Sequence, residues 1–264
     1  MLVFLSISIT TAGRLTDSFL SLAVTNVRSR PSGDSVVEFD EFGGLPQLEN
    51  TYRAIGKSAS VVAIRTVNAT LLSHTAKNSS SLQIPVGAQS LNSLINPWQY
   101  LLITGLAGDA RCVVRHAKQV VLNYTVAFDS PPSGRYIAHE VGKFLQEYTV
   151  RGGIRPLACH TFIADSLIEK SLYEVDAAGN VAQIWAGVGG RSMAMGRNIL
   201  EGHLNGTAVS SVETARAIAE SILKVPDKGT LQMKKLGEGA DGDEVEENKD
   251  FIVTHFVLYD KDSR

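Results

Sequence analysis

The sequence has few of the residues that build disulfide scaffolds and metal centres. Its only two cysteines, Cys112 and Cys159, have no C-x-x-C spacing, which argues against a disulfide framework or a cysteine zinc site and favours a reducing compartment. The six histidines share no H-x-x-x-H or H-E-x-x-H spacing, so we expect no metal and no cofactor. A G-x-S-x-G elbow is also lacking, which argues against an α/β-hydrolase.

An excess of one charge is lacking too. Lys and Arg number 25 against 27 Asp and Glu, for a net charge of −2, so nothing suggests a nucleic-acid partner. The apolar residues 1–13 are too short and too rich in Ser and Thr to span a bilayer. No Lys or Arg precedes them, where a secretory signal carries a basic region. We therefore expect no membrane association.

Four Asn-x-Ser/Thr sequons keep a secreted glycoprotein open as an alternative. They begin at Asn68, Asn78, Asn123 and Asn205. Because Ser and Thr are frequent, about two such sequons are expected by chance. Asn123 also falls in a predicted helix, where a glycan is less expected.

The patterning predicts an irregular extension over residues 1–38 and one domain over residues 39–264, with an acidic loop at 237–250. Helical spacing of apolar residues marks five segments: 45–57, 109–123, 134–148, 191–204 and 211–224. Ser210 and Glu213 stand at capping-box spacing before the last of them. Strand patterns mark 60–66, 69–77, 100–105, 157–165, 171–176, 181–187 and 251–260. Strand runs separated by helix pairs predict an α+β fold of packed sheets covered by helix layers.

Two glycine-rich segments are weak candidates for anion binding. Residues 237–243, GEGADGD, contain G-x-G-x-x-G, but no strand precedes them and their acidic residues would repel a phosphate. A solvated acidic loop is the better interpretation. Residues 186–198, AGVGGRSMAMGRN, could hold an anion with Arg191 at a helix start. We favour a strand-to-helix turn that needs glycines for backbone room.

The third glycine-rich segment is GLAGDAR, residues 105–111, which we call the corner. It joins an apolar strand to a helix, so a phosphate loop, a catalytic aspartate and a simple turn are all conceivable. We predict the turn, with Gly105 and Gly108 allowing the bend. Asp109 is predicted to cap the helix by accepting from its free N–H groups.

Four motifs in order resemble the α-type subunits of the proteasome core particle. FDEFGGLPQLENTYRAI, residues 39–55, is similar to that family's N-terminal signature, with matches at Phe39, Gly43, Leu45, Gln47, Glu49 and Ala54. The corner, with its Asp109 and Arg111, resembles the family's G-L-x-A-D-A-R. Tyr148, Thr149, Arg155 and Pro156 match a Y-T…R-P motif, and residues 172–201 parallel the strand-turn-strand-helix segment that follows. The resemblance covers about residues 39–225.

This resemblance implies the N-terminal-nucleophile hydrolase fold, a four-layer α/β/β/α sandwich with two antiparallel sheets between helix layers. It implies a structural subunit of the outer ring that serves assembly, docking of regulatory particles and control of substrate entry in protein degradation. The implied partners are other α-type subunits in a seven-membered ring, β-type subunits and activators. The implied location is cytoplasm and nucleus. The helix of the N-terminal signature, which includes Tyr52, is expected to contact a ring neighbour.

The catalytic residues of β-type relatives have no counterparts here. The register of the resemblance places Ala59 or Ser60 where the nucleophilic threonine would be, with no Gly-Thr processing junction before it. The strand-end Asp expected near Thr75 is missing, and no Lys occurs between residues 78 and 111. We therefore expect no enzymatic activity. The alternative is an active hydrolase processed at Ser58 or Ser60.

Three departures from the family pattern limit the expected contacts. The gate-forming Y-D-R before Phe39 is absent, and SGDSVVE stands in its place. Arg, Phe and Tyr of the helix signature are replaced by Gly44, Pro46 and Asn50. The activator-binding lysine expected near Ser90 is missing. We therefore assign this chain neither a gating contact nor a lysine-lined activator pocket.

Overall fold

The computed structural model describes residues 38–76, 92–151, 154–166, 170–204, 209–224 and 251–258, of which Ala76, residues 92–94 and residues 251–258 are described as backbone only. The acidic loop predicted at 237–250 lies outside the described residues. So does the extension predicted at 1–38, apart from Glu38. The division of the chain into an extension and one domain therefore stays a prediction.

The described helices and strands alternate in runs, as the sequence pattern predicts. The helices are α2 (Pro46–Ile55), α3 (Ala107–Phe128), α4 (Gly134–Val150), α5 (Met193–His203) and α6 (Val212–Leu223). The strands are β1 (Val61–Arg65), β2 (Ala69–Ala76), β3 (Asn92–Asn96), β4 (Gln99–Gly105), β5 (Cys159–Asp165), β6 (Ser171–Val175), β7 (Val181–Ile184), β8 (Ala186–Gly189) and β9 (Phe251–Leu258).

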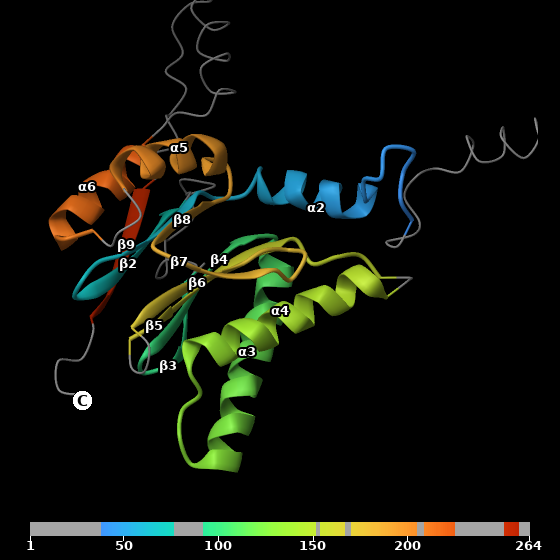
Figure 1. The fold of residues 1–264 in the computed structure, drawn as a ribbon, viewed down its shortest axis with the longest axis horizontal. Helices are drawn as coiled ribbons and strands as arrows, with labels where there is room; N and C mark the ends of the chain where they lie inside the picture. Colours follow the sequence, from blue (N-terminus) through green and yellow to red (C-terminus); the bar gives the residue numbers. More distant parts are fainter. Residues whose placement is uncertain are drawn as a thin grey trace, which may run out of the picture.

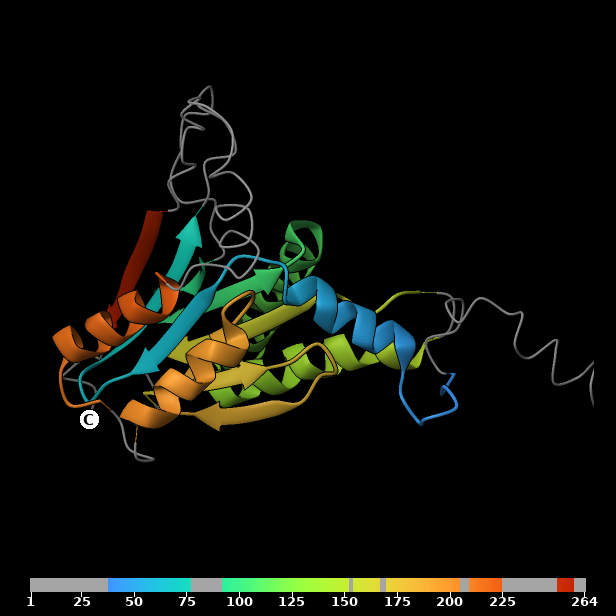
Figure 2. The same cartoon turned by 90° about the horizontal axis from the view of Figure 1, so that it is seen from above.

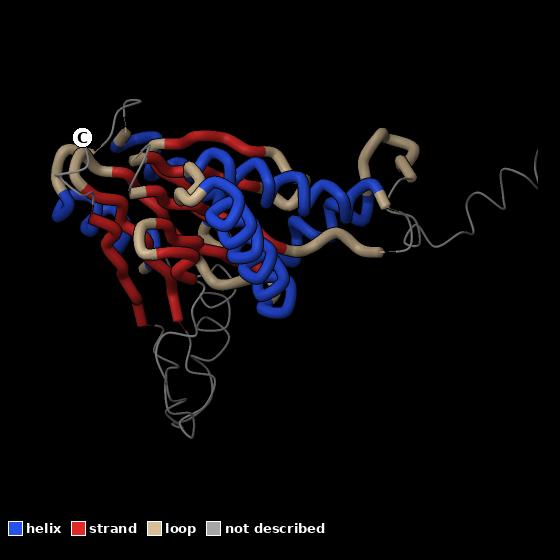
Figure 3. Tube along the Cα trace, turned by 90° about the horizontal axis from the view of Figure 1, so that it is seen from below, coloured by secondary structure: helices blue, strands red, loops and turns tan. Residues whose placement is uncertain are grey.

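The strands form two antiparallel sheets that stack face to face. The four-stranded sheet has the order β8-β1-β2-β9 and the five-stranded sheet the order β3-β4-β5-β6-β7. Helices α5 and α6 cover the first sheet, and α3 and α4 cover the second (Figures 1 and 2). Viewed from below in Figure 3, helices of this layer lie in front of the strands. The predicted four-layer α/β/β/α sandwich is confirmed.

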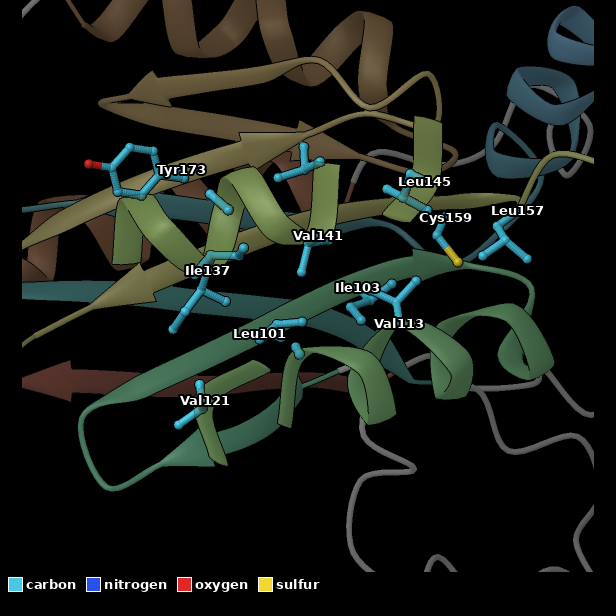
Figure 4. Packing of buried hydrophobic residues seen from close by; sticks show 14 residues of the cluster. Leu101, Ile103, Val113, Val121, Ile137, Val141, Leu145, Leu157, Cys159 and Tyr173 are labelled. Carbon is cyan, nitrogen blue, oxygen red and sulfur yellow. The ribbon is translucent and has the colours of Figure 1, made fainter. Parts of the chain in front are cut away.

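Three hydrophobic clusters fill the three interfaces between these layers. One joins the five-stranded sheet to α3 and α4, and Figure 4 shows Ile103, Val113 and Cys159 of this cluster pointing toward one another. A second joins the four-stranded sheet to α5 and α6. The third lies between the sheets and contains Phe162 and Leu172. Each sheet is therefore buried on both faces.

This two-sided burial explains the nearly continuous apolar runs in the strands. Successive strand residues point to opposite faces. Leu101 and Ile103 of β4 accordingly pack under the helices, whereas Leu102 between them packs against the other sheet. In β5, Cys159 and Ile163 face the helices, and Phe162 faces the other sheet.

One strand prediction was wrong, and one strand was missed. The run at 181–187, predicted as one strand, forms β7 in one sheet and β8 in the other, with Trp185 between them. No Gly or Pro marks this crossing, and the Trp185 carbonyl still accepts from the Arg65 N–H at 2.8 Å. Strand β3 was not predicted, because its sequence NSLIN lacks a strand-like alternation.

The helix predictions are correct within two residues at each end, except that α3 continues to Phe128, five residues past its predicted end. Pro46 lies in the first turn of α2 as predicted, together with Glu49. The predicted cap of α6 is off by one residue. Ser211, rather than Ser210, accepts from the Glu213 N–H at 3.1 Å and donates to the Glu213 carboxylate at 2.7 Å. Because Ser210 and Ser211 are adjacent, the sequence alone did not show which of them caps the helix.

Phe162 tests the packing between the sheets. Its side chain is 0 % exposed, so we expect Phe162→Ala to lower the free energy of unfolding by about 3 to 5 kcal/mol, through lost burial and a cavity. The matched control is Phe42→Ala, because Phe42 is 95 % exposed, and its effect should stay within about 0.5 kcal/mol. Urea unfolding of both variants measures the difference. Equal effects would contradict the assignment of Phe162 to the core.

Candidate functional site

The start of β1 is where the resemblance places a catalytic nucleophile. The chain runs from α2 into Ser60, which is 6 % exposed. The Ser60 N–H donates to Thr75 Oγ1 at 3.1 Å, and its hydroxyl is hydrogen-bonded to the Ser192 hydroxyl at 2.7 Å. The Ser192 N–H also donates to the Ser60 hydroxyl, at 3.2 Å. In this intact chain the Ser60 nitrogen is a buried amide rather than a free amine.

Ser58, the other proposed nucleophile, is hydrogen-bonded in a similar way. Its hydroxyl lies 2.6 Å from the Ile55 carbonyl and 2.7 Å from Thr104 Oγ1, which in turn donates to the Ala59 carbonyl at 2.6 Å. Within the described part of the chain, neither Ser58 nor Ser60 is hydrogen-bonded to a Lys, His, Asp or Glu side chain. A general base in hydrogen-bond reach of either hydroxyl is what nucleophilic catalysis requires.

The glycine-rich segment at 186–198 closes over this start of β1. Gly190 has φ +78°, and a Cβ there would lie 2.1 Å from the Ala59 carbonyl oxygen. The Arg191 N–H donates to the Ser58 carbonyl at 3.2 Å. The predicted strand-to-helix turn, which needs glycine for backbone room, is confirmed.

The corner is organised differently from its prediction. Helix α3 begins at Ala107 after Leu106, and no side chain caps it. Asp109 lies within the first turn and is 7 % exposed. Its carboxylate accepts from both terminal nitrogens of Arg155, at 2.6 and 2.7 Å, and from the Ala158 N–H at 2.9 Å. The prediction that Asp109 caps the helix was therefore wrong.

The surroundings of the Asp109 carboxyl favour its ionised form. Its burial raises the pKa, but the hydrogen bonds from Arg155 and from the Ala158 N–H, together with the Arg155 charge, lower it more. The net effect is a pKa below the usual 3.8. Two motifs that lie 46 residues apart thus meet in one bidentate ion pair.

Of the two predicted turn glycines, only Gly105 stands at a position where a side chain would not fit. Gly105 has φ +136°, and a Cβ there would lie 1.9 Å from the Ala158 carbonyl oxygen. That oxygen accepts from the Leu106 N–H at 2.9 Å. A Cβ on Gly108 would meet nothing within 4 Å. Arg111, the last family match in the corner, is exposed.

The remaining residues of the Y-T…R-P motif have local contacts. Tyr148 packs edge-on against Phe144, with ring centroids 5.2 Å apart, and the Thr149 hydroxyl donates to the Gln146 carbonyl at 2.8 Å. Pro156 is buried, and its carbonyl accepts from Arg155 at 3.0 Å. Arg155 is the member of this motif that reaches the corner.

The signature segment presents a partly exposed surface. Phe39, Glu49 and Tyr52 are exposed, and Leu45, Gln47 and Ala54 are half-buried. Gly43 adopts φ +79° in the turn before α2. Figure 1 shows α2 running outward from the end of the sheets.

Sequence reasoning missed the residues against which α2 rests. The Tyr52 hydroxyl donates to Asp176 Oδ2 at 3.3 Å. Burial and the Asp176 carboxylate raise the pKa of Tyr52 to about 12. Ile55 forms a small buried cluster with Ala158 and Ala177. Nothing in the sequence around Ala158, Asp176 and Ala177 predicts that these residues contact α2, because the contact depends on the fold.

One pocket of about 350 Å³ also opens on the described surface. It lies between β7–β8 and α5, where Trp185, Glu174 and Arg197 are among its lining residues. The Arg65 guanidinium lies 4.8 Å from the centre of a Trp185 ring. The described residues contain no group of three or more His, Cys, Asp or Glu side chains placed to bind a metal. No helix among them has the length and apolar character of a membrane span.

Comparisons with known proteins agree on one family. A family model described as proteasome subunit matches residues 55–231. The chain is 27% identical to proteasome subunit alpha type-7 of Dictyostelium discoideum over 204 residues, which are 76% of this chain and 80% of that protein. It is 28% identical to alpha type-7-B of Arabidopsis thaliana over 198 residues, 74% of this chain and 78% of the relative. It is also 28% identical to the probable alpha type-2 subunit of Neurospora crassa over 214 residues, with coverages of 78% and 85%.

Alanine at the two corner glycines tests the close approach to Ala158. Gly105→Ala should lower the free energy of unfolding by about 3 kcal/mol, because it adds backbone strain and a clash with the Ala158 carbonyl. Gly108→Ala is the matched control, and it should be neutral or stabilising by about 0.5 kcal/mol, since the added methyl group meets open space in a helix. Thermal and urea unfolding of both variants give the comparison. Similar effects of the two substitutions would contradict this structure of the corner.

Asp109→Ala should cost more than the roughly 1 kcal/mol expected for a lost helix cap. We expect about 2 to 3 kcal/mol, because the buried Ala158 N–H loses its acceptor and Arg155 loses its partner. Urea unfolding near neutral pH measures this loss. A loss no greater than that of a cap would count against the contacts with Arg155 and Ala158.

The lowered pKa of Asp109 predicts a dependence of stability on acid. Since the folded-state pKa lies below 3.8, the carboxylate stabilises the fold above that pH and loses its contribution as the pH falls through the folded-state value. The difference in unfolding free energy between wild type and Asp109→Asn should therefore be full at about pH 7 and smaller at about pH 3. A difference that stays constant would show that the ionised carboxylate contributes nothing.

Proposed function

The chain belongs to the proteasome subunit family as an α-type subunit of the outer ring, and from this premise we propose how it acts. It assembles with other proteasome subunits. We propose that its partners are further α-type subunits in a seven-membered ring, β-type subunits below that ring, and regulatory particles above it. Its work there is assembly, docking and control of substrate entry in protein degradation.

We propose further that the chain has no catalytic activity of its own. The observation that carries this is the start of β1, where α2 precedes Ser60 and the Ser60 hydroxyl is hydrogen-bonded to Ser192 rather than to a base. An N-terminal nucleophile needs a free amine next to its hydroxyl. Formation of that amine would require removal of α2, which packs through Ile55 against Ala158 and Ala177.

The exposed side of the signature segment supports a role in ring contacts. Phe39, Phe42 and Tyr52 are large side chains that remain exposed in the single chain. Large aromatic residues of this kind are enriched at protein interfaces. We propose that this surface is covered by a neighbouring subunit in the assembled ring.

The proposed location is cytoplasm and nucleus. It is supported by the absence of a cysteine pair with scaffold spacing in the sequence, since disulfide frameworks are typical of secreted domains. Of the four sequons, Asn68 and Asn123 are exposed in the structure, and the other two lie outside the described residues. Fractionation with a glycosidase digest tests the location, and a glycosidase-sensitive band in the secretory fraction would contradict it.

Purification of a C-terminally tagged chain from its own cells tests the proposed function. We expect co-elution with α-type and β-type subunits in a particle of several hundred kilodaltons, and an intact mass that still includes the residues before Ser58. Ser60→Ala, with Ser58→Ala beside it, should leave the peptidase activity of the particle unchanged. Elution as a monomer would contradict the assembly role. A new N-terminus at Ser58 or Ser60, with activity lost on its substitution, would support an active hydrolase instead.

A further inference from the structure

Residues 155–158, which we call the strap, are tied to the corner at both ends. At one end Arg155 donates to both oxygens of Asp109, at 2.6 and 2.7 Å. At the other end the Ala158 N–H donates to Asp109 at 2.9 Å, and the Ala158 carbonyl accepts from the Leu106 N–H at 2.9 Å. Gly105 brings the two backbones so close that no Cβ would fit. The corner therefore determines where the backbone of Ala158 lies.

The last turn of α2 rests on Ala158 and Ala177, which we call the seat of this helix. Ala158 is 2 % exposed and packs in one cluster with Ile55 and Ala177. Beside it, Asp176 accepts from the Tyr52 hydroxyl and also from the N–H groups of Ala178 and Asn180, so the turn that carries Ala177 is itself held firmly. Ile55 and Tyr52 both lie in the last turn of α2. The contacts with Ala158 and with the 176–177 turn thus hold the same end of the helix.

The other end of α2 projects from the body of the molecule. No side chain caps the helix at Leu45, and Phe39 and Phe42 just before it are exposed. Figures 1 and 2 show α2 leading away from the sheets toward this end. A small rotation at the seat therefore moves the exposed end of the signature segment.

We propose that the Asp109–Arg155 ion pair positions α2, by fixing the strap on which the last turn of that helix rests. Asp109 and Arg155 are then positioning residues for a surface that neither of them touches. The consequence for ring assembly rests on the proposed function, because it assumes that α2 meets a neighbouring subunit. The effect on α2 within the single chain does not depend on that assumption.

Arg155→Met breaks the ion pair and removes the donor to Asp109 Oδ1, while Asp109 Oδ2 keeps the bond from the Ala158 N–H. The side chain of Arg155 is 57 % exposed, so this substitution removes a guanidinium group at an exposed position. Arg155→Lys keeps the charge but loses the bidentate geometry. Arg151→Met is the matched control, because Arg151 makes an exposed ion pair with Glu147 at 3.6 Å only four residues before Arg155.

Hydrogen exchange followed by mass spectrometry on the full-length chain tests the effect on α2. With Arg155→Met we expect exchange in α2 to become about tenfold faster, as local opening becomes easier, while α6 on the far layer is unchanged. Arg155→Lys should restore part of the protection, and Arg151→Met should match wild type. Ile55→Ala removes the side chain that packs on Ala158 and Ala177. Its exchange rates in α2 show what a weakened contact of this helix looks like.

Equal exchange in α2 for Arg155→Met and Arg151→Met would overturn the proposal. So would faster exchange that is uniform across α2 and α6, since that indicates a general loss of stability. Faster exchange in the strap and in α2 but not in α6, reduced by Arg155→Lys, supports a positioning role, which mere filling of space by the side chain would not produce.

Co-expression with α-type partner subunits tests the consequence for assembly. We expect wild type and Arg151→Met to enter the ring equally, and Arg155→Met to enter several-fold less at equal amounts of folded chain. Failure of wild type to enter would contradict the proposed function and leave the exchange result to decide on the positioning of α2. Normal entry of Arg155→Met despite a loosened α2 would overturn the link between the ion pair and assembly.

Discussion

Burial of both faces of both sheets is the constraint on which the rest of this structure depends. A sheet buried on one face by its companion still needs a helix layer on the other, and this chain supplies helix pairs for both. With all four layers in use, α2 has no sheet face left to cover. It rests instead on loop residues at the end of the sandwich, against Ala158 and Ala177. The helix that presents the family signature is thus held by contacts with a few small residues.

The start of β1, where the resemblance places a nucleophile, is occupied by a network of hydroxyl groups. Hydroxyls of Ser58, Ser60, Thr104 and Ser192 are hydrogen-bonded to one another or to nearby carbonyls. Such a network satisfies buried polar groups and holds the upstream helix to the first strand. This part of the chain joins α2 to the sandwich.

Sequence patterns predicted most elements, and their failures have local physical causes. The crossing at Trp185 was missed because the chain passes from one sheet to the other without a turn residue. The α6 cap was assigned to Ser210 because two adjacent serines satisfy the same spacing. Asp109 was assigned to its own helix because spacing shows only near neighbours, whereas its partners Arg155 and Ala158 come from another segment.

The sequence by itself determined the layers, the family and the residue types at the corner, since burial periodicity and motif spacing are local properties of the chain. Only the tertiary structure decided which groups meet. Ser60 finds Ser192 across 132 residues and Asp109 finds Arg155 across 46. A residue's type states which hydrogen bonds and charges it can offer, but its partner depends on how distant segments pack. For this reason the corner, predicted as a self-contained turn, proved to be the attachment point of the strap beneath α2.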